Sequence, residues 1–207
     1  MQSMVQSVKE MGVIYPVIVR KKDNGKYEMI SGHRRKMASV LAGKKEIKCI
    51  VKNLNDDEAT ILMVDSNIQR EEILPSEKAY SYKMKLDAIK HQGRKIEETS
   101  NQLGGKNNES AQLLGEDQGD SGTQVRRYIR LTKLIPEILK KVDEKRIAFN
   151  PAVEISYLTQ EEQTKLYDAM ECNDATPSLG QAIHLKKLSQ AISFYNKYLK
   201  QRKREER

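Results

Sequence analysis

Apolar positions near the start of the chain follow a strand-like pattern. Residues 12–21 contain the β-branched run VIYPVIV, which is typical of a strand, and Pro16 within it indicates an edge position or a break. The turn signal Asp-Asn-Gly at 23–25 separates this run from a return strand, YEMISG. A short helix, KMASVLAG, then ends at Gly43 and is followed by a third strand, EIKCIVKNL. This order predicts a small α+β unit.

The pattern becomes helical after residue 55. The segment DDEATILMVDSN begins with acidic residues, as helix N-termini prefer, and predicts a helix that ends near Asn67. Pro75 opens a second helix, which we expect Gly93 to close. Residues 94–109 are polar, carry two adjacent glycines and predict a loop.

The segment SAQLLGEDQGDSGTQVRRYIRLTKL has the spacing of a helix-turn-helix. A short apolar helix leads to a turn at Gly119, and Val125 and Ile129 are the apolar positions of the next helix. Either Asp120 or Ser121 is expected to cap that second helix, because both side chains accept hydrogen bonds from helix N–H groups.

Further helices are indicated by prolines and capping signals. Pro136 and Pro151 mark helix starts, residues 159–162 resemble a capping box, and residues 176–178 form a break before the last helix. A length of 207 residues suits one large or two small domains. The predicted fold class is α+β, divided into an N-terminal α+β domain at 1–92, an all-α helix-turn-helix domain at 93–190 and a basic tail at 191–207.

Composition adds a polyanionic partner to this picture. Thirty-seven basic against 29 acidic residues give a net charge of +8, which favours nucleic acid before a membrane surface, although a solvated lysine-rich surface is the alternative. Aromatic residues make up only 5% and Trp is absent, which excludes an aromatic base-stacking platform.

The cysteines and the lack of long apolar runs indicate the compartment. Cys49 and Cys172 stand in no C-x-x-C motif, and Cys49 in the run IKCIV is expected to be a buried strand residue. No apolar run reaches the roughly 20 residues of a membrane span. We therefore expect a cytoplasmic protein with no membrane partner.

Arg34 and Arg35 lie at a predicted strand-to-helix junction beside Gly32. Guanidinium groups bind phosphate through paired donors, and helix N-terminal N–H groups add to the same field. The pair therefore predicts an anion site, with ordinary surface arginines as the alternative. About thirty residues later, SNIQREEILP forms a second polar cluster.

The second helix of the helix-turn-helix carries side chains suited to DNA. Gln pairs with adenine and Arg with guanine in the major groove, while Thr and Arg also suit phosphates. An amphipathic helix with solvated arginines is the alternative. The candidate DNA-binding residues are Ser121, Thr123, Gln124, Arg126, Arg127 and Arg130.

The segments GVIYPVIVR, SGHRRKMA and SNIQREEILPSEKA resemble the successive boxes of the ParB/Noc family of partition proteins, over most of residues 4–92. In that family the boxes bind CTP with Mg²⁺. The resemblance implies an α+β nucleotide-binding domain and places Asn67 at the metal. The nucleotide-binding residues that it implies are Gly32, His33, Arg34, Arg35, Ala38, Ser66, Asn67 and Arg70.

Two acidic positions of the family pattern are replaced here. His33 and Ser66 stand where the family has Glu, so two hard oxygen ligands and a general base are lost at these positions. Asp65 and Glu71 are the neighbouring carboxylates that could take their place. We assign no catalytic residue and expect nucleotide binding with weak or absent CTP hydrolysis.

The resemblance also implies a function and partners. The helix-turn-helix would read a centromere-like, parS-type site for plasmid or chromosome partition, gated by CTP. The implied partners are double-stranded DNA, a second copy in a homodimer or higher self-association, and a ParA-type ATPase, on the nucleoid or a plasmid. The alternatives are a helix-turn-helix transcriptional regulator or nucleoid-occlusion protein and, more remotely, a small-molecule kinase of the same N-terminal fold.

Overall fold

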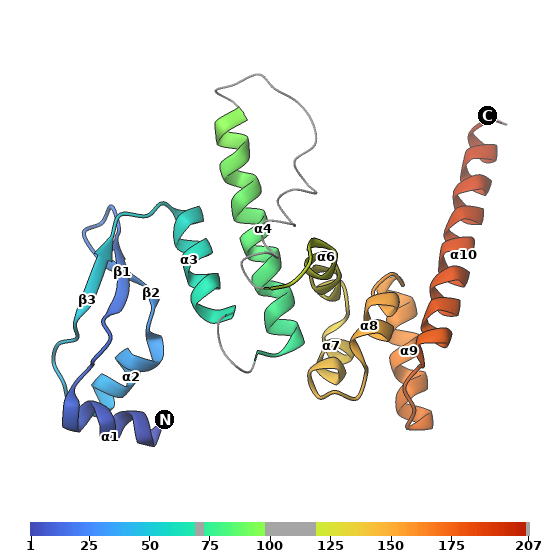
Figure 1. Cartoon of the computed structure of the whole chain (residues 1–207). Coiled ribbons are helices and arrows are strands. Elements are labelled where there is room, and N and C mark those ends of the chain that lie inside the picture. The colour runs from blue at the N-terminus through green and yellow to red at the C-terminus, as the bar shows by residue number, and fades with distance from the viewer. Residues whose placement is uncertain (69–72, 98–118, 206–207) are drawn as a thin grey trace. The chain divides into compact units, whose positions relative to one another are not determined.

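The computed structural model describes residues 1–68, 73–97 and 119–205, which fall into two compact units (Figure 1). Residues 1–68 and 84–97 belong to the first unit, and residues 73–83 and 119–205 belong to the second. Helix α4, Pro75–Glu97, contributes to both units. The mixed strand and helix content confirms the predicted α+β class.

A three-stranded sheet organises the first unit. The strands β1 (Val17–Lys21), β2 (Tyr27–Ser31) and β3 (Cys49–Lys52) lie in the order β2-β1-β3. β1 pairs antiparallel with β2 through the predicted hairpin and parallel with β3. Since β1 is central, Pro16 does not mark an edge strand. It marks a break, and the strand begins at the next residue.

Helices surround this sheet. α1 (Gln2–Met11) packs against α2 (His33–Leu41), while α3 (Asp56–Ile68) contacts β2. The sequence did not predict α1, whose single buried residue is Val8. α2 and α3 lie close to their predicted positions, and α3 ends one residue beyond Asn67.

Two local predictions for the first unit are wrong. Cys49 is exposed rather than buried, because all four residues of β3 face solvent. Gly93 does not close α4, which continues to Glu97, so the predicted division at residue 92 falls inside a helix. A single Gly costs a helix interior only about 1 kcal/mol, which neighbouring residues can offset.

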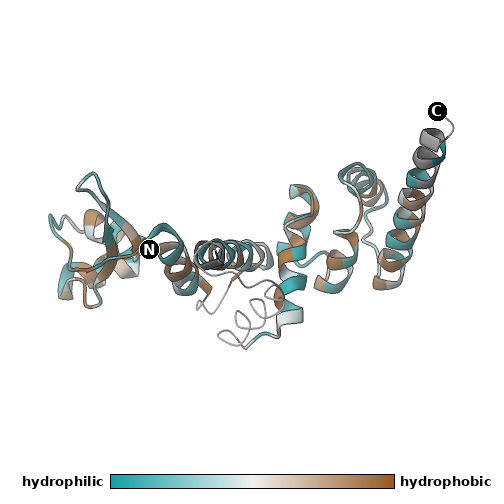
Figure 2. Cartoon of the chain, turned by 90° about the horizontal axis from the view of Figure 1, so that it is seen from above, coloured by the Kyte–Doolittle hydropathy of each residue, from teal (hydrophilic) through white to brown (hydrophobic). Residues whose placement is uncertain are grey.

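Among residues 119–205 of the second unit the structure has five helices: α6 (Gly122–Leu131), α7 (Pro136–Asp143), α8 (Phe149–Ile155), α9 (Gln160–Asn173) and α10 (Leu179–Glu205). Their apolar faces meet in one core, which also takes in Ala79 of α4. Figure 2 shows apolar and polar positions sharing each of these helices, as expected for helices with one buried face.

The helix starts of this unit follow the sequence signals. α7 begins at Pro136, and Thr159 and Glu162 form the predicted capping box of α9. α8 begins at Phe149, so Pro151 lies in its first turn rather than at its start. The first helix of the predicted helix-turn-helix lies outside the described residues.

Within the described part of the chain, every helix is too short or too polar to cross a membrane.

Candidate nucleotide and DNA sites

A hollow of about 270 Å³ lies at the start of α2, in the first unit. It gathers residues from α1, the β2–α2 junction and the last turns of α3. Of the predicted nucleotide-binding residues, those that line it are Gly32, His33, Arg34, Arg35, Ser66 and Asn67. Two boxes that are thirty residues apart in sequence therefore meet at one site.

Gly32 shapes this hollow. Its φ of +103° is in the left-handed region, and a Cβ at this position would come within 2.6 Å of Val17 Cγ1. Only Gly permits this turn so close to β1. Gly32 is also the N-cap of α2 and supplies no side-chain cap, so the first N–H groups of the helix remain available to an anion.

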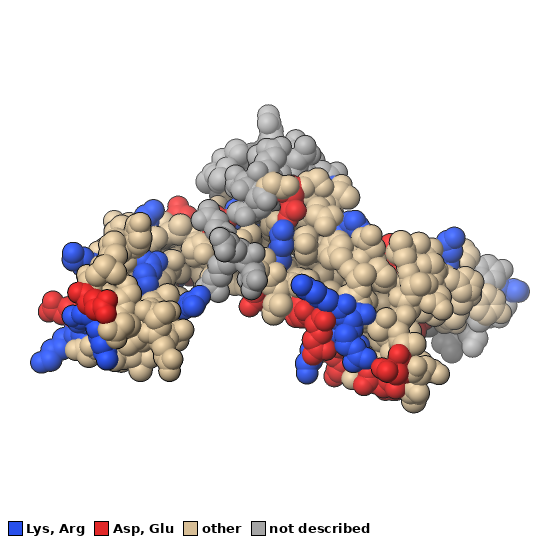
Figure 3. Space-filling view, turned by 60° about the horizontal axis from the view of Figure 1, so that its bottom comes forward, with Lys and Arg blue, Asp and Glu red and all other residues tan. Residues whose placement is uncertain are grey.

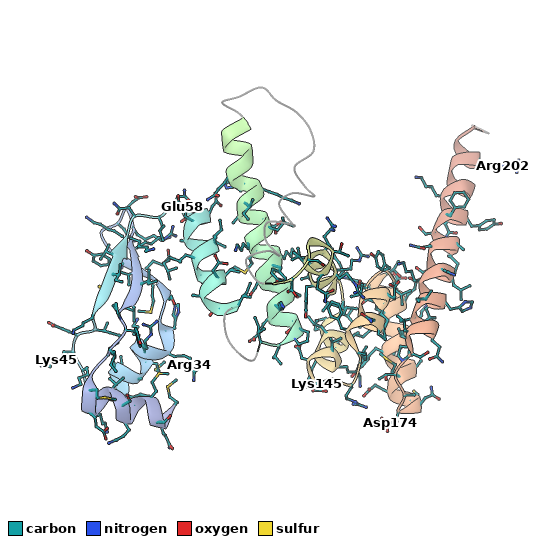
Figure 4. The ribbon with its side chains drawn as sticks, viewed as in Figure 1. Arg34, Lys45, Glu58, Lys145, Asp174 and Arg202 are labelled. Carbon is teal, nitrogen blue, oxygen red and sulfur yellow. The ribbon has the colours of Figure 1, made fainter. Side chains whose placement is uncertain are left out.

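The two arginines have different environments. Arg34 is exposed and extends outward from α2 (Figure 4). Arg35 donates from Nη1 to the carbonyl oxygens of Tyr15 and Pro16, each at 2.7 Å. Arg35 thus holds α2 to the segment before β1 while still lining the hollow, and Arg34 is the arginine that is free to reach a ligand.

The opposite wall comes from the end of α3. Ser66 and Asn67 line the hollow, and the Ser66 hydroxyl donates to the Met63 carbonyl at 2.8 Å. Asp65 does not line it, because its carboxylate accepts from Lys85 Nζ of α4 at 2.6 Å. Arg70 and Glu71 lie outside the described residues.

Among the described residues, Ala38 is the predicted nucleotide-binding residue that does not line the hollow. Its side chain is fully buried, at 0% exposure, one turn along α2. Its small size permits the close packing of α2 within the first unit.

The described donor set of this hollow does not fit Mg²⁺. The described lining offers neutral oxygens from Ser31, Ser66 and Asn67 and contains no carboxylate. Mg²⁺ sites in proteins are usually built on one or two carboxylates together with substrate phosphates. Across the described residues, no three or more His, Cys, Asp or Glu side chains gather as a metal site.

In the second unit, α6 is the candidate DNA-reading helix. Gly119 takes a φ of +72° at the predicted turn, and the Ser121 hydroxyl accepts from the Gln124 N–H at 3.2 Å as the N-cap. Val125 and Leu131 are fully buried on one face. Thr123 and Arg126 are exposed on another, and Arg126 Nη2 donates to Thr123 Oγ1 at 3.5 Å.

The other two arginines of α6 anchor the helix. Arg127 donates to Asn150 Oδ1 at 2.6 Å and lies over the Phe149 ring. Arg130 donates to the Ser156 hydroxyl and carbonyl, and its guanidinium stacks 4.0 Å from the centre of the Tyr157 ring. Both arginines therefore join α6 to α8 and its C-terminal end.

Asp120 clamps the start of α6 instead of capping it. Its carboxylate accepts from the Tyr82 hydroxyl and from Lys78 Nζ of α4, each at 2.6 Å. Burial alone would raise the pKa of Asp120, but the hydrogen bonds from Lys78 and Tyr82 outweigh it and hold that pKa below its usual value. Burial also raises the pKa of the Tyr82 phenol.

Charges of both signs share the surface of each unit. On the face shown in Figure 3, Lys and Arg side chains lie beside Asp and Glu side chains rather than forming one uniform basic area. The net charge therefore does not by itself locate a DNA-binding surface. The candidate surface is identified from the exposed side chains of α6.

Residues 1–68 match the family model described as the ParB N-terminal domain. Over these residues the chain is similar to ParB N-terminal domains. The predicted resemblance to ParB and Noc proteins is confirmed by its curated relatives. The chromosome-partitioning protein Spo0J of Thermus thermophilus is 29% identical over 163 residues, which cover 79% of this chain and 53% of the relative. The nucleoid occlusion protein of Geobacillus thermodenitrificans is 43% identical over 76 residues, covering 37% and 27%.

Solved ParB structures share the fold. A Pnob8-like ParB-N domain has a TM-score of 0.56 at 20% identity, covering 94% of this chain and 86% of its own. A C-terminally truncated ParB from Caulobacter crescentus, complexed to the centromeric parS site, has a TM-score of 0.52 at 18% identity, covering 92% and 89%. The chain spans about half the length, or less, of the curated relatives it matches.

The first unit also contains lining residues that the sequence did not single out. Met4 of α1 and Ile30 and Ser31 of β2 complete the hollow. Ser31 directly precedes Gly32, so its place beside the predicted anion site was the sequence signal that could have identified it. Met4 could not be found in the same way, because nothing in its neighbourhood predicted that α1 would pack beside α2.

Proposed function

We propose that this chain is a site-specific DNA-binding protein for DNA partition, whose ParB N-terminal domain binds CTP. The observation that carries the proposal is the hollow at the start of α2, where Gly32, Arg34 and Asn67 meet. The names of the curated relatives, which are chromosome-partitioning and nucleoid occlusion proteins, support the same biological role.

The hollow suits the phosphates of a nucleotide. Arg34 offers paired donors and a positive charge, and the uncapped N-terminus of α2 offers N–H groups beside it. Ser66 and Asn67 add neutral polar groups on the opposite wall. We assign cytosine as the base from the resemblance of the two boxes to those of the ParB/Noc family. We do not assign the Mg²⁺ that this resemblance also implies, because the lining residues do not fit it.

The α6 helix suits a duplex. Thr123, Gln124 and Arg126 lie in its first turns, where a helix-turn-helix contacts base edges and phosphates. Arg127 and Arg130 act behind them by holding the helix in place, although both were candidates for DNA contact. The target that we propose is a centromere-like, parS-type site, read by a pair of copies.

Self-association and a ParA-type ATPase are the further partners that the resemblance implies. Hydrolysis of CTP is proposed to be weak or absent, because His33 and Ser66 replace two carboxylates and Asp65 is paired with Lys85. Release of phosphate from CTP, measured with the purified chain, would contradict this part if it were brisk.

Nucleotide binding is tested by titrating the purified chain calorimetrically with CTP, UTP, ATP and GTP. We expect CTP to bind at least about tenfold more tightly than the other three, which corresponds to about 1.4 kcal/mol. Equal affinity for all four would contradict the assignment of the base, and no binding of any would contradict the nucleotide site.

Gating is tested by cross-linking the chain on circular DNA that carries its selected site, with and without CTP. We expect CTP to increase the amount of chain retained on the circle. The double variant R34A/R35A should lose this CTP dependence and still bind the site. Persistence of the CTP dependence in that variant would show that the phosphate site is wrongly assigned.

Nucleoid occlusion is the second candidate, favoured by the 43% identity over 76 residues to the Geobacillus protein. It shares the proposed DNA and nucleotide chemistry and differs in where the sites lie. Binding sites gathered near one origin would favour partition, and sites scattered around a chromosome would favour occlusion.

A further inference from the structure

We infer that the nucleotide in this hollow is held without a divalent cation, an inference that rests on the proposed CTP site. The charged residues of the described lining are both basic, Arg34 and Arg35, and His33 lies beside them. Such a lining places positive charge against the phosphates directly. A nucleotide-binding site that uses Mg²⁺ normally combines phosphate oxygens with protein carboxylates.

A divalent cation would meet repulsion here rather than support. Arg34 is exposed at the hollow, and like charges within a few ångströms of each other disfavour binding. The oxygen donors on the opposite wall, Ser66 and Asn67, are neutral and balance none of the ion's charge. Hard cations such as Mg²⁺ also give up their water reluctantly for neutral ligands.

The carboxylate that adjoins Ser66 in the sequence is already engaged. Asp65 directly precedes Ser66, but it accepts from Lys85 Nζ at 2.6 Å, and that lysine is only 5% exposed. Freeing Asp65 would break its ion pair with this buried ammonium group, which is costly. Asp65 is therefore retained by α4 and is not a metal ligand in this arrangement.

The N-terminus of α2 helps to balance the negative charge of the phosphates. Gly32 caps the helix without a side chain, so the first N–H groups remain open to phosphate oxygens. Together with Arg34, these donors provide along one helix end the positive field that a metal ion would otherwise supply. The nucleotide would enter as the free triphosphate.

Calorimetric titration of the whole chain with CTP tests this inference, once in buffer with Mg²⁺ and once with EDTA. We expect the two dissociation constants to agree within about threefold. A larger loss of affinity in EDTA would overturn the inference without contradicting the proposed CTP site. No binding in either buffer would contradict the proposed CTP site itself, so the two failures are distinguishable.

Matched variants sharpen the test. H33E and S66E introduce carboxylates at the two lining positions, so each should weaken binding in EDTA by at least about tenfold and regain affinity when Mg²⁺ is added. H33Q and S66Q change the same positions without adding charge and should gain no dependence on Mg²⁺. If the Glu variants also bound equally well in both buffers, the donor-set argument would be wrong.

Discussion

Arg34 and Arg35 are adjacent in the sequence but have separate tasks in the structure. Arg35 joins α2 to the backbone of Tyr15 and Pro16, whereas Arg34 extends from the helix beside the hollow. Because both are arginines at adjacent positions, the sequence did not reveal this difference. It follows that a substitution at Arg34 should affect the ligand, and one at Arg35 should affect the position of α2 as well.

The first prediction concerns Arg34→Ala. Loss of a charge-assisted hydrogen bond to phosphate should weaken CTP binding by about 10- to 100-fold, since such bonds contribute about 1.5–3 kcal/mol. Lys36→Ala is the matched control, because Lys36 is an exposed cation of the same helix that does not line the hollow. Calorimetric titration should find K36A close to the parent chain. Equal losses of CTP affinity in both variants would mean that the net positive charge of the helix, and not a specific contact of Arg34, binds the nucleotide.

Gly32 gives the second prediction. Ala at this position must keep a φ of +103° and place its Cβ 2.6 Å from Val17 Cγ1, so G32A should destabilise the first unit by about 1–3 kcal/mol. Gly180 is the control, since an added Cβ there meets nothing within 4 Å. Urea unfolding followed by circular dichroism measures both. A G32A chain as stable as G180A would contradict the tight junction between β1 and α2.

Several residues of the site could be read from the sequence because their chemistry is local. A Gly before a pair of arginines at a strand-to-helix junction predicts a turn and an anion site, and both positions line the hollow. Cys49 could not be placed in this way. An apolar run such as IKCIV fits a strand, but what covers that strand depends on the rest of the fold, and here β3 is exposed.

Among the elements, α6 is held at both ends by contacts from other helices. Asp120 connects its start to Tyr82 and Lys78 of α4, and Arg130 connects its last turn to Ser156. A recognition helix must present its side chains in a constant orientation if it is to distinguish base pairs. These contacts supply that constancy within the second unit.

The third prediction separates reading from anchoring on α6. Arg126→Ala should weaken DNA binding and reduce the salt dependence of the affinity by about one phosphate contact. Arg130→Ala should lower the stability of the second unit, because it removes two hydrogen bonds and the stacking on Tyr157.

Fluorescence anisotropy at several salt concentrations and thermal unfolding measure these two effects. If R126A left the DNA affinity and its salt dependence unchanged, the assignment of Arg126 to DNA contact would be incorrect.

The fourth prediction is a pH dependence set by Asp120. Its folded pKa lies below the usual value, so its contribution is present above the unfolded pKa of about 3.9 and is lost as the pH falls through the folded pKa. Asp120→Asn should therefore destabilise the second unit at neutral pH by about 1–3 kcal/mol, and the difference should shrink towards pH 3 and below. Urea unfolding at a series of pH values measures it.

Asp168→Asn is the control for that series, because Asp168 is exposed on α9. D168N should track the parent chain at every pH. A D120N difference that stayed constant from neutral to acid pH would contradict the charged clamp.

Elements with strong end signals were the predictable ones. The prolines that begin α4 and α7, and the Thr159 capping box, placed helix starts correctly. Helix ends were less predictable. α4 continues past Gly93 to Glu97, although a Gly near a helix end often marks its end. α1 was missed, although Met4, Val5, Val8 and Met11 have the spacing of an amphipathic helix.

For the whole molecule, the notable feature is that α4 serves both units. Its first part contributes Tyr82 and Lys78 to the clamp on Asp120, and its later part contributes Lys85 to the pair with Asp65, next to Ser66. The local sequence predicted the helix but not this sharing, because each partner lies far away along the chain. The same sharing is why composition shifts alone do not mark where one unit ends.

The central claim is that the chain selects a DNA site through α6 under the control of CTP. Selection from a random pool of duplex DNA, with and without CTP, tests it most directly. We expect one palindromic motif to be enriched, its retention to change with CTP, and the enrichment to disappear in the T123A/Q124A/R126A variant. A pool without an enriched motif, or a motif that the variant and CTP both leave unchanged, would contradict the account.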